Sequence, residues 1–181
     1  QSGFIREIGT ELYHQMLEEE ILFQKQKISN DNSHKSIFQP TIKIPEEIFI
    51  PDEFIDDLDL RLSIYKRISS VNNNEDLSNL IIELRDRFGP IPKELNNLFN
   101  LIEIKILCIE YNVEQFEFSR KGIVIGFYKN EPQNPEKLLD LSMKRHSQFT
   151  LRPDQKIFYD FMGKLNSNRF DLSKQILDKI K

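Results

Sequence analysis

The chain has 181 residues, of which 39% are hydrophobic and 30% are charged, a composition typical of a folded globular domain. Its net charge of −4 excludes a general attraction to nucleic acid or anionic membranes, so any such contact would need a local basic patch. There is no hydrophobic run near the roughly 20 residues that span a bilayer, no signal-peptide pattern and only one cysteine, so we expect a cytoplasmic chain without membrane contact.

The N-terminal part differs in pattern from the rest of the chain. Hydrophobic residues recur at helical spacing over residues 4–28, whereas the residues that follow are polar and have no periodicity. We therefore predict that residues 1–28 form a helical segment belonging to an upstream module. Residues 29–40 would be a linker, and residues 41–181 a separate C-terminal domain.

The first half of this domain is predicted to be mostly helical. A short strand is expected at 41–44, followed by helices at about 54–70, 75–88 and 92–111. Gly89 and Pro90 end the second helix. That helix carries a hydrophobic stripe formed by Leu77, Leu80, Ile81, Leu84 and Phe88.

The second half alternates between strand and helix patterns. Alternating hydrophobic residues on both sides of the turn 119–122 predict a hairpin, and a second hairpin is expected at 149–159. A helix near 135–146 lies between them, and a last helix uses Leu172, Ile176 and Ile180. The order predicts an α+β fold with helices packed on a small, mainly antiparallel sheet, preceded by the separate helical segment.

Catalytic and metal-binding patterns are missing. No glycine-rich phosphate loop is present, and the three histidines, His14, His34 and His146, are far apart in the sequence. Cys108 lies in a hydrophobic run and is expected to be a buried, reduced thiol. The acidic residues Asp52, Glu53, Asp56, Asp57 and Asp59 do not have calcium-loop spacing and are favoured by the dipole at a helix N-terminus. We therefore expect no metal site and no catalytic residue.

A basic and aromatic group near the end of the first helix has two interpretations. Arg61, Tyr65, Lys66 and Arg67, with Arg120 and Lys121 at the hairpin tip, are the residues that a nucleic-acid-binding accessory domain would use. In the alternative, Arg61 pairs with Asp57 and Tyr65 is half-buried. We favour the alternative because the net charge is negative.

The second helix offers a stronger candidate. With about 100° per residue, its stripe centres near Leu84, so Asp86 points away from the core with Glu83 beside it, while Arg85 and Arg87 flank the stripe. A carboxylate in the last turn of a helix faces the negative end of the dipole. This arrangement indicates a docking surface, although an intramolecular pair with a neighbouring arginine is the other interpretation.

Several motifs, in order, resemble the C-terminal region of the bacterial transcription-repair coupling factor family. An N-terminal stretch, Gly9–x–x–Leu12–Tyr13, resembles the end of that family's translocase module, which closes in a helical hook. The motifs of the terminal domain are Ile44–Pro45, Ile50–Pro51–Asp52, Arg61–Leu62–x–x–Tyr65–Lys66–Arg67, Glu83–Leu84–x–Asp86–Arg87–Phe88–Gly89–x–x–Pro92 and Leu151–Arg152–Pro153–Asp154–x–Lys156.

The resemblance implies a function for the whole parent protein and a role for this part of it. The parent would be an ATP-dependent DNA translocase that displaces stalled RNA polymerase from duplex DNA and recruits the excision-repair protein UvrA. Its ATP and magnesium would be bound by the upstream motor, so this fragment would hold no cofactor and would not be an enzyme. Residues 41–181 would form a regulatory domain that docks on the parent's UvrB-like N-terminal module and masks its UvrA-binding surface.

The resemblance also implies which residues make this contact. The family's contact residues include the acidic residues of its second motif, which correspond to Glu83 and Asp86, and Arg87 follows directly. Arg61, Tyr65 and Arg67 are secondary candidates.

Overall fold

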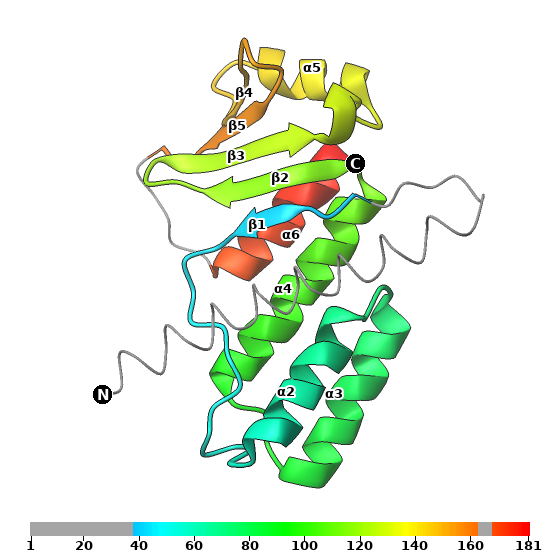
Figure 1. Cartoon of the computed structure of the whole chain (residues 1–181). Coiled ribbons are helices and arrows are strands. Elements are labelled where there is room, and N and C mark those ends of the chain that lie inside the picture. Colours follow the sequence, from blue (N-terminus) through cyan, green and yellow to red (C-terminus); the bar gives the residue numbers. More distant parts are fainter. Residues whose placement is uncertain (1–37, 163–167) are drawn as a thin grey trace, which may run out of the picture. The chain divides into compact units, whose positions relative to one another are not determined.

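The computed structural model describes residues 38–162 and 168–181 of the chain (Figure 1). The predicted N-terminal helix, nearly all of the predicted linker, His14 and His34 lie outside these residues. The described chain forms two compact units, one made of residues 46–103 and the other of residues 38–45, 104–162 and 168–181.

The first unit contains α2 (Leu58–Ser69), α3 (Asn74–Phe88) and the first part of α4 (Lys93–Glu110). The predicted second and third helices are confirmed, but α2 begins four residues later than predicted. Its start is set by Asp57, whose Oδ1 accepts a hydrogen bond of 2.7 Å from the amide of Leu60. The residues before it form a turn, in which the amides of Phe54 and Ile55 both donate to the carbonyl of Pro51.

The hydrophobic stripe of α3 is buried, as its spacing predicts. Leu84 is completely buried, and only 1% of Leu77 and 5% of Leu80 are exposed. Gly89 ends the helix with a φ of 91°, a conformation that side chains rarely adopt, and its amide donates to the carbonyl of Arg85 at 2.9 Å. Other buried residues of this unit include Ile64 and Ile68 of α2 and Leu95, Leu98, Phe99 and Ile102 of α4.

The second unit is built on a five-stranded sheet in the order β1-β2-β3-β5-β4. Its strands are β1 (Thr41–Lys43), β2 (Val113–Phe118), β3 (Gly122–Phe127), β4 (Phe149–Leu151) and β5 (Ile157–Asp160). β1 is parallel to β2, and the other three pairs are antiparallel. The predicted α+β class with a mainly antiparallel sheet and two hairpins is therefore confirmed.

Helices complete this unit. A short 3-10 helix (Tyr128–Asn130) leads to α5 (Pro135–Met143), and α6 (Arg169–Ile180) runs across one face of the sheet (Figure 1). α5 ends before the predicted residue 146, because Lys144, directly after the helix, has an extended conformation with a ψ of 137°. His146 follows in a turn with a φ of 60°. Cys108 is completely buried as predicted, and burial raises the pKa of its thiol, which keeps it protonated and unreactive.

Candidate partner-binding surface on α3

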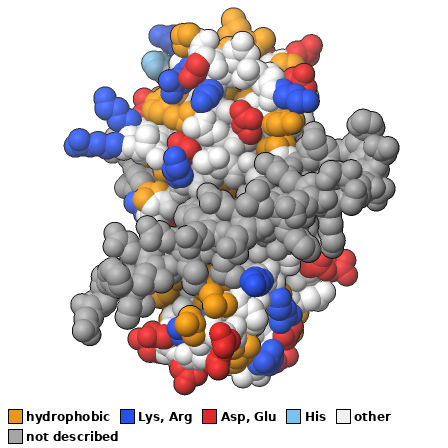
Figure 2. Space-filling view, in the orientation of Figure 1, with side chains coloured by type: hydrophobic (Ala, Val, Ile, Leu, Met, Phe, Trp, Pro, Cys, Tyr) orange, Lys and Arg blue, Asp and Glu red, His pale blue; other side chains and the backbone are white. Residues whose placement is uncertain are grey.

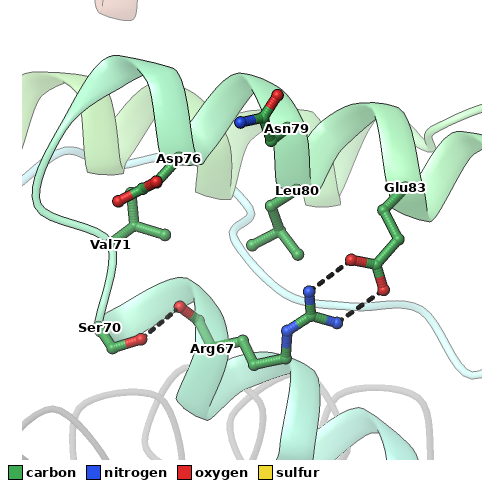
Figure 3. Close-up of a pocket in the computed structure, with 7 residues that line it drawn as sticks. All are labelled: Arg67, Ser70, Val71, Asp76, Asn79, Leu80 and Glu83. Atoms are coloured by element: carbon green, nitrogen blue, oxygen red, sulfur yellow. Dashed lines mark hydrogen bonds and ion pairs between the residues drawn. The ribbon is translucent and has the colours of Figure 1, made fainter.

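The side chain of Glu83 is bound by two arginines. Arg67, from the last turn of α2, donates from Nη1 to Glu83 Oε1 at 2.8 Å and from Nη2 to Oε2 at 2.5 Å (Figure 3). Arg87, one turn further along α3, donates to Oε1 at 3.3 Å. We call these three residues the Glu83 cluster. Its central contact is the bidentate form that gives an arginine–carboxylate pair a fixed geometry.

The Glu83 cluster changes the electrostatics of this part of α3. Hydrogen bonds from Arg67 hold the pKa of the Glu83 carboxyl at about 2, and Arg87 adds to the effect. The same bond raises the pKa of Arg67. For Glu83, the interpretation as an intramolecular pair with an arginine is therefore confirmed. Two positive charges surround this carboxylate, so it contributes little negative charge to the surface.

The effect of Arg67 on the pKa of Glu83 can be measured directly. In an Arg67→Gln variant, the pKa of Glu83 should rise from about 2 toward the ordinary value of 4.5, because the largest lowering cause is removed while Arg87 remains. A carbon-detected NMR titration of the Glu83 carboxyl would show it. The lowered pKa means that the pair stabilises the fold at neutral pH and that this contribution disappears as the pH falls toward 2. An unchanged pKa would mean that the pair does not persist in solution.

A shallow hollow of about 340 Å³ lies beside the Arg67–Glu83 pair, between the C-terminal end of α2 and α3. Its lining mixes charged, polar and hydrophobic side chains from Arg67, Ser70, Val71, Asp76, Asn79, Leu80 and Glu83 (Figure 3). Within residues 38–162 and 168–181, no three His, Cys, Asp or Glu side chains lie close enough to hold a metal ion. The hollow provides polar groups for contact with another molecule.

Asp86 is placed differently from Glu83. It is exposed, and in the described part of the chain its side chain makes no ion pair or hydrogen bond. It lies two residues beyond the completely buried Leu84, which at about 100° per residue directs it away from the core. The prediction that Asp86 faces outward is confirmed, whereas Glu83 lies on the side of α3 that meets α2.

Arg61 and Tyr65 have structural partners within the first unit. Arg61 donates from Nη1 to the carbonyl oxygens of Ile55 at 2.5 Å and Asp56 at 3.2 Å. The predicted pairing of Arg61 with Asp57 is wrong, because the Asp57 carboxylate caps α2 instead.

Tyr65 is buried, with 4% of its surface exposed, and not half-buried as predicted. Its hydroxyl accepts a hydrogen bond of 2.7 Å from the amide of Ile50, and burial raises its pKa. Arg61 and Tyr65 therefore hold the segment before α2 against that helix, which accounts for them without a partner molecule.

The basic residues named in the sequence analysis are divided between the two units. Arg61, Lys66 and Arg67 lie on α2 in the first unit, whereas Arg120 and Lys121 form the β2–β3 turn in the second. Arg61 and Arg67 are engaged by neighbouring groups of the same unit. None of the helices in residues 38–162 and 168–181 has the length and hydropathy needed to cross a membrane.

Comparisons with known proteins place this chain in a family. The TRCF domain family matches residues 44–138, which include all of α2 and α3. The chain is 39% identical over 160 residues to the transcription-repair-coupling factor of Rickettsia bellii, covering 88% of this chain and 14% of that protein. It is 30% identical to the factor of Haemophilus influenzae, covering 95% of this chain and 15% of that protein. It is also 30% identical to the factor of Escherichia coli, covering 83% of this chain and 13% of that protein.

A solved structure shares the fold. It is the crystal structure of the C-terminal domain of a transcription-repair coupling factor, which aligns with a TM-score of 0.66 and 20% identity over 82% of this chain and 95% of that one. The chain therefore has the same α+β fold as the C-terminal domain of that transcription-repair coupling factor. The chain belongs to the transcription-repair coupling factor family through its TRCF domain, and it spans about 14% of the length of the first relatives.

Proposed function

We propose that residues 41–181 form a regulatory domain that docks on the UvrB-like N-terminal module of the parent protein and masks its UvrA-binding surface. The parent would be a cytoplasmic, ATP-dependent DNA translocase of transcription-coupled DNA repair. It would displace stalled RNA polymerase from duplex DNA, and its ATP and magnesium would be bound by the motor upstream of this chain. The domain itself would act only by binding.

The exposed carboxylate of Asp86 is the observation that carries this proposal. It lies inside the segment that matches the TRCF domain, on the outward face of α3, with no ion pair or hydrogen bond in the described part of the chain. In the last turn of a helix it is also disfavoured by the helix dipole. A charge that neither packing nor the dipole explains is suited to meet an arginine or lysine of a partner.

The Glu83 cluster has a supporting role in this proposal. Because Arg67 and Arg87 already bind the carboxylate, a basic group of the partner would have to compete with them for Glu83. We therefore assign the main electrostatic contact to Asp86. Glu83 and Arg87 would shape the surface around it, and Arg67 would hold Glu83 in place.

Binding of this chain to the separately purified N-terminal module tests the proposal. The wild-type chain should bind in isothermal titration calorimetry, and Asp86→Lys should weaken binding at least tenfold, because a desolvated charge pair would be replaced by like charges. Asp140→Lys is a matched control, since Asp140 is an exposed carboxylate on α5. Absence of wild-type binding, or equal losses in both variants, would contradict the proposal.

A further inference from the structure

Ile82 is an exposed hydrophobic residue in the middle of α3. The structure leaves 55% of it accessible to solvent. It lies two residues from Leu80 and two from Leu84, which are 5% and 0% exposed, so it points about 160° away from the buried stripe. Single exposed hydrophobic residues are common on protein surfaces, so the surroundings of Ile82 decide what it means.

Neither the core nor the helix accounts for isoleucine at this position. The side chain is on the face opposite the stripe, so it adds little to the packing of the unit. Isoleucine is also a weaker helix former than the alanine, leucine, lysine or glutamate that would serve on an exposed face. The residue therefore adds hydrophobic surface without an evident benefit to the isolated domain.

The neighbours of Ile82 on the outward face are polar or charged. Asn79 and Asp86 lie one turn before and after it and are exposed. Glu75, two turns before Ile82, lies on the same outward face, so that two carboxylates, those of Glu75 and Asp86, accompany the positive charge of Arg85. Figure 2 shows charged and hydrophobic side chains mixed over α2 and α3. A hydrophobic centre within a polar rim is the arrangement found at protein–protein contacts.

We propose that Ile82 is the hydrophobic anchor of the surface on which Asp86 makes its charge contact. The occupant would be the parent's N-terminal module, offering a hydrophobic recess bordered by arginine or lysine side chains. The carboxylates of Glu75 and Asp86 beside Ile82 favour basic side chains on the partner, whereas a second copy would bring the same two carboxylates against them. This inference rests on the proposed docking function and adds the residue that supplies hydrophobic contact.

The variant Ile82→Ser tests the anchor in calorimetric binding to the purified N-terminal module. Serine and isoleucine have similar helix propensities, so the helix should be retained. If docking buries the exposed half of the isoleucine side chain, its removal should lower the affinity about tenfold. Leu139→Ser is the matched control, because Leu139 is 47% exposed on α5 in the other unit, and it should leave affinity unchanged.

Salt separates the hydrophobic contact from the charge contact. The loss caused by Ile82→Ser should be equal at low and high salt, whereas the loss caused by Asp86→Lys should shrink as salt rises. Circular dichroism of each variant verifies the fold, and Ile82→Val, which keeps a hydrophobic side chain, should bind within about threefold of wild type.

The outcomes distinguish this inference from the function on which it rests. Absence of wild-type binding would overturn both. Binding that depends on Asp86 but is unchanged in Ile82→Ser would overturn the anchor alone. A change in self-association of the chain in sedimentation, without a change in binding to the module, would identify a second copy as the occupant and would also overturn the inference.

Discussion

In the full-length parent protein, Asp86→Lys should raise the affinity for UvrA at least tenfold when RNA polymerase is absent. If docking masks the UvrA-binding surface, loss of docking exposes it. Removing one partner of a desolvated charge pair costs about 2–5 kcal/mol, and each 1.4 kcal/mol corresponds to about tenfold in affinity. Surface plasmon resonance with immobilised UvrA, comparing wild-type and variant parent, is the measurement.

The structure favours this single substitution over a double charge reversal. Glu83→Lys would bring a third positive charge to the site where Arg67 and Arg87 already lie, so it would disturb the contact between α2 and α3 as well as any docking. Asp86 has no such partner in the described residues, and a lysine in the last turn is favoured by the helix dipole. Unchanged UvrA affinity with an intact fold would remove the docking role from Asp86.

Leu84→Ala should destabilise the domain by about 2–5 kcal/mol, the range for removing a large side chain from a close-packed core. Leu84 is completely buried and lies at the centre of the α3 stripe. Urea unfolding followed by circular dichroism would give the change in the free energy of unfolding. The free energy of unfolding of a domain is about 5–15 kcal/mol in total, so this single substitution would remove a large part of the stability.

Ile82→Ala is the control for this measurement. It removes a hydrophobic side chain from the same helix two residues away, but from the exposed face, so its effect should stay within about 0.5 kcal/mol. Equal losses in the two variants would mean that α3 is rotated relative to the described structure. The outward directions of Asp86 and Ile82 would then have to be assigned again.

Elements with strong local signals were predictable from the sequence. The stripe of α3, its stop at Gly89 and the two hairpins each depend on residues close together in the chain. The start of α2 was not, because it depends on which of several neighbouring acidic residues caps the helix, and that residue is Asp57. The early end of α5 depends in turn on the extended conformation of Lys144, which no local pattern predicts.

In the candidate site, too, only the features that depend on residues close together in the sequence were predictable. The outward direction of Asp86 follows from helix periodicity alone. The bond between Arg67 and Glu83 joins residues 16 positions apart on two helices, so it depends on how α2 and α3 pack. Glu83 lies about 100° from Leu84 on the helix, which places it at the flank of α3. That angle was the available signal that it faces a neighbouring helix.

The chain leaves the second unit after β1 and returns to it within α4, so the first unit is an insertion between two paired strands. Ile42 of β1 pairs with Phe116 of β2 only after everything between them has been brought together. Because closing so long a loop costs entropy, we expect this parallel pair to form late in folding, after the helices of the insertion, whose contacts are nearer in sequence. Excising the insertion by itself would cut α4 between Ile102 and Ile104, both completely buried. We therefore expect that the first unit has to be expressed together with the second to keep its last helix whole.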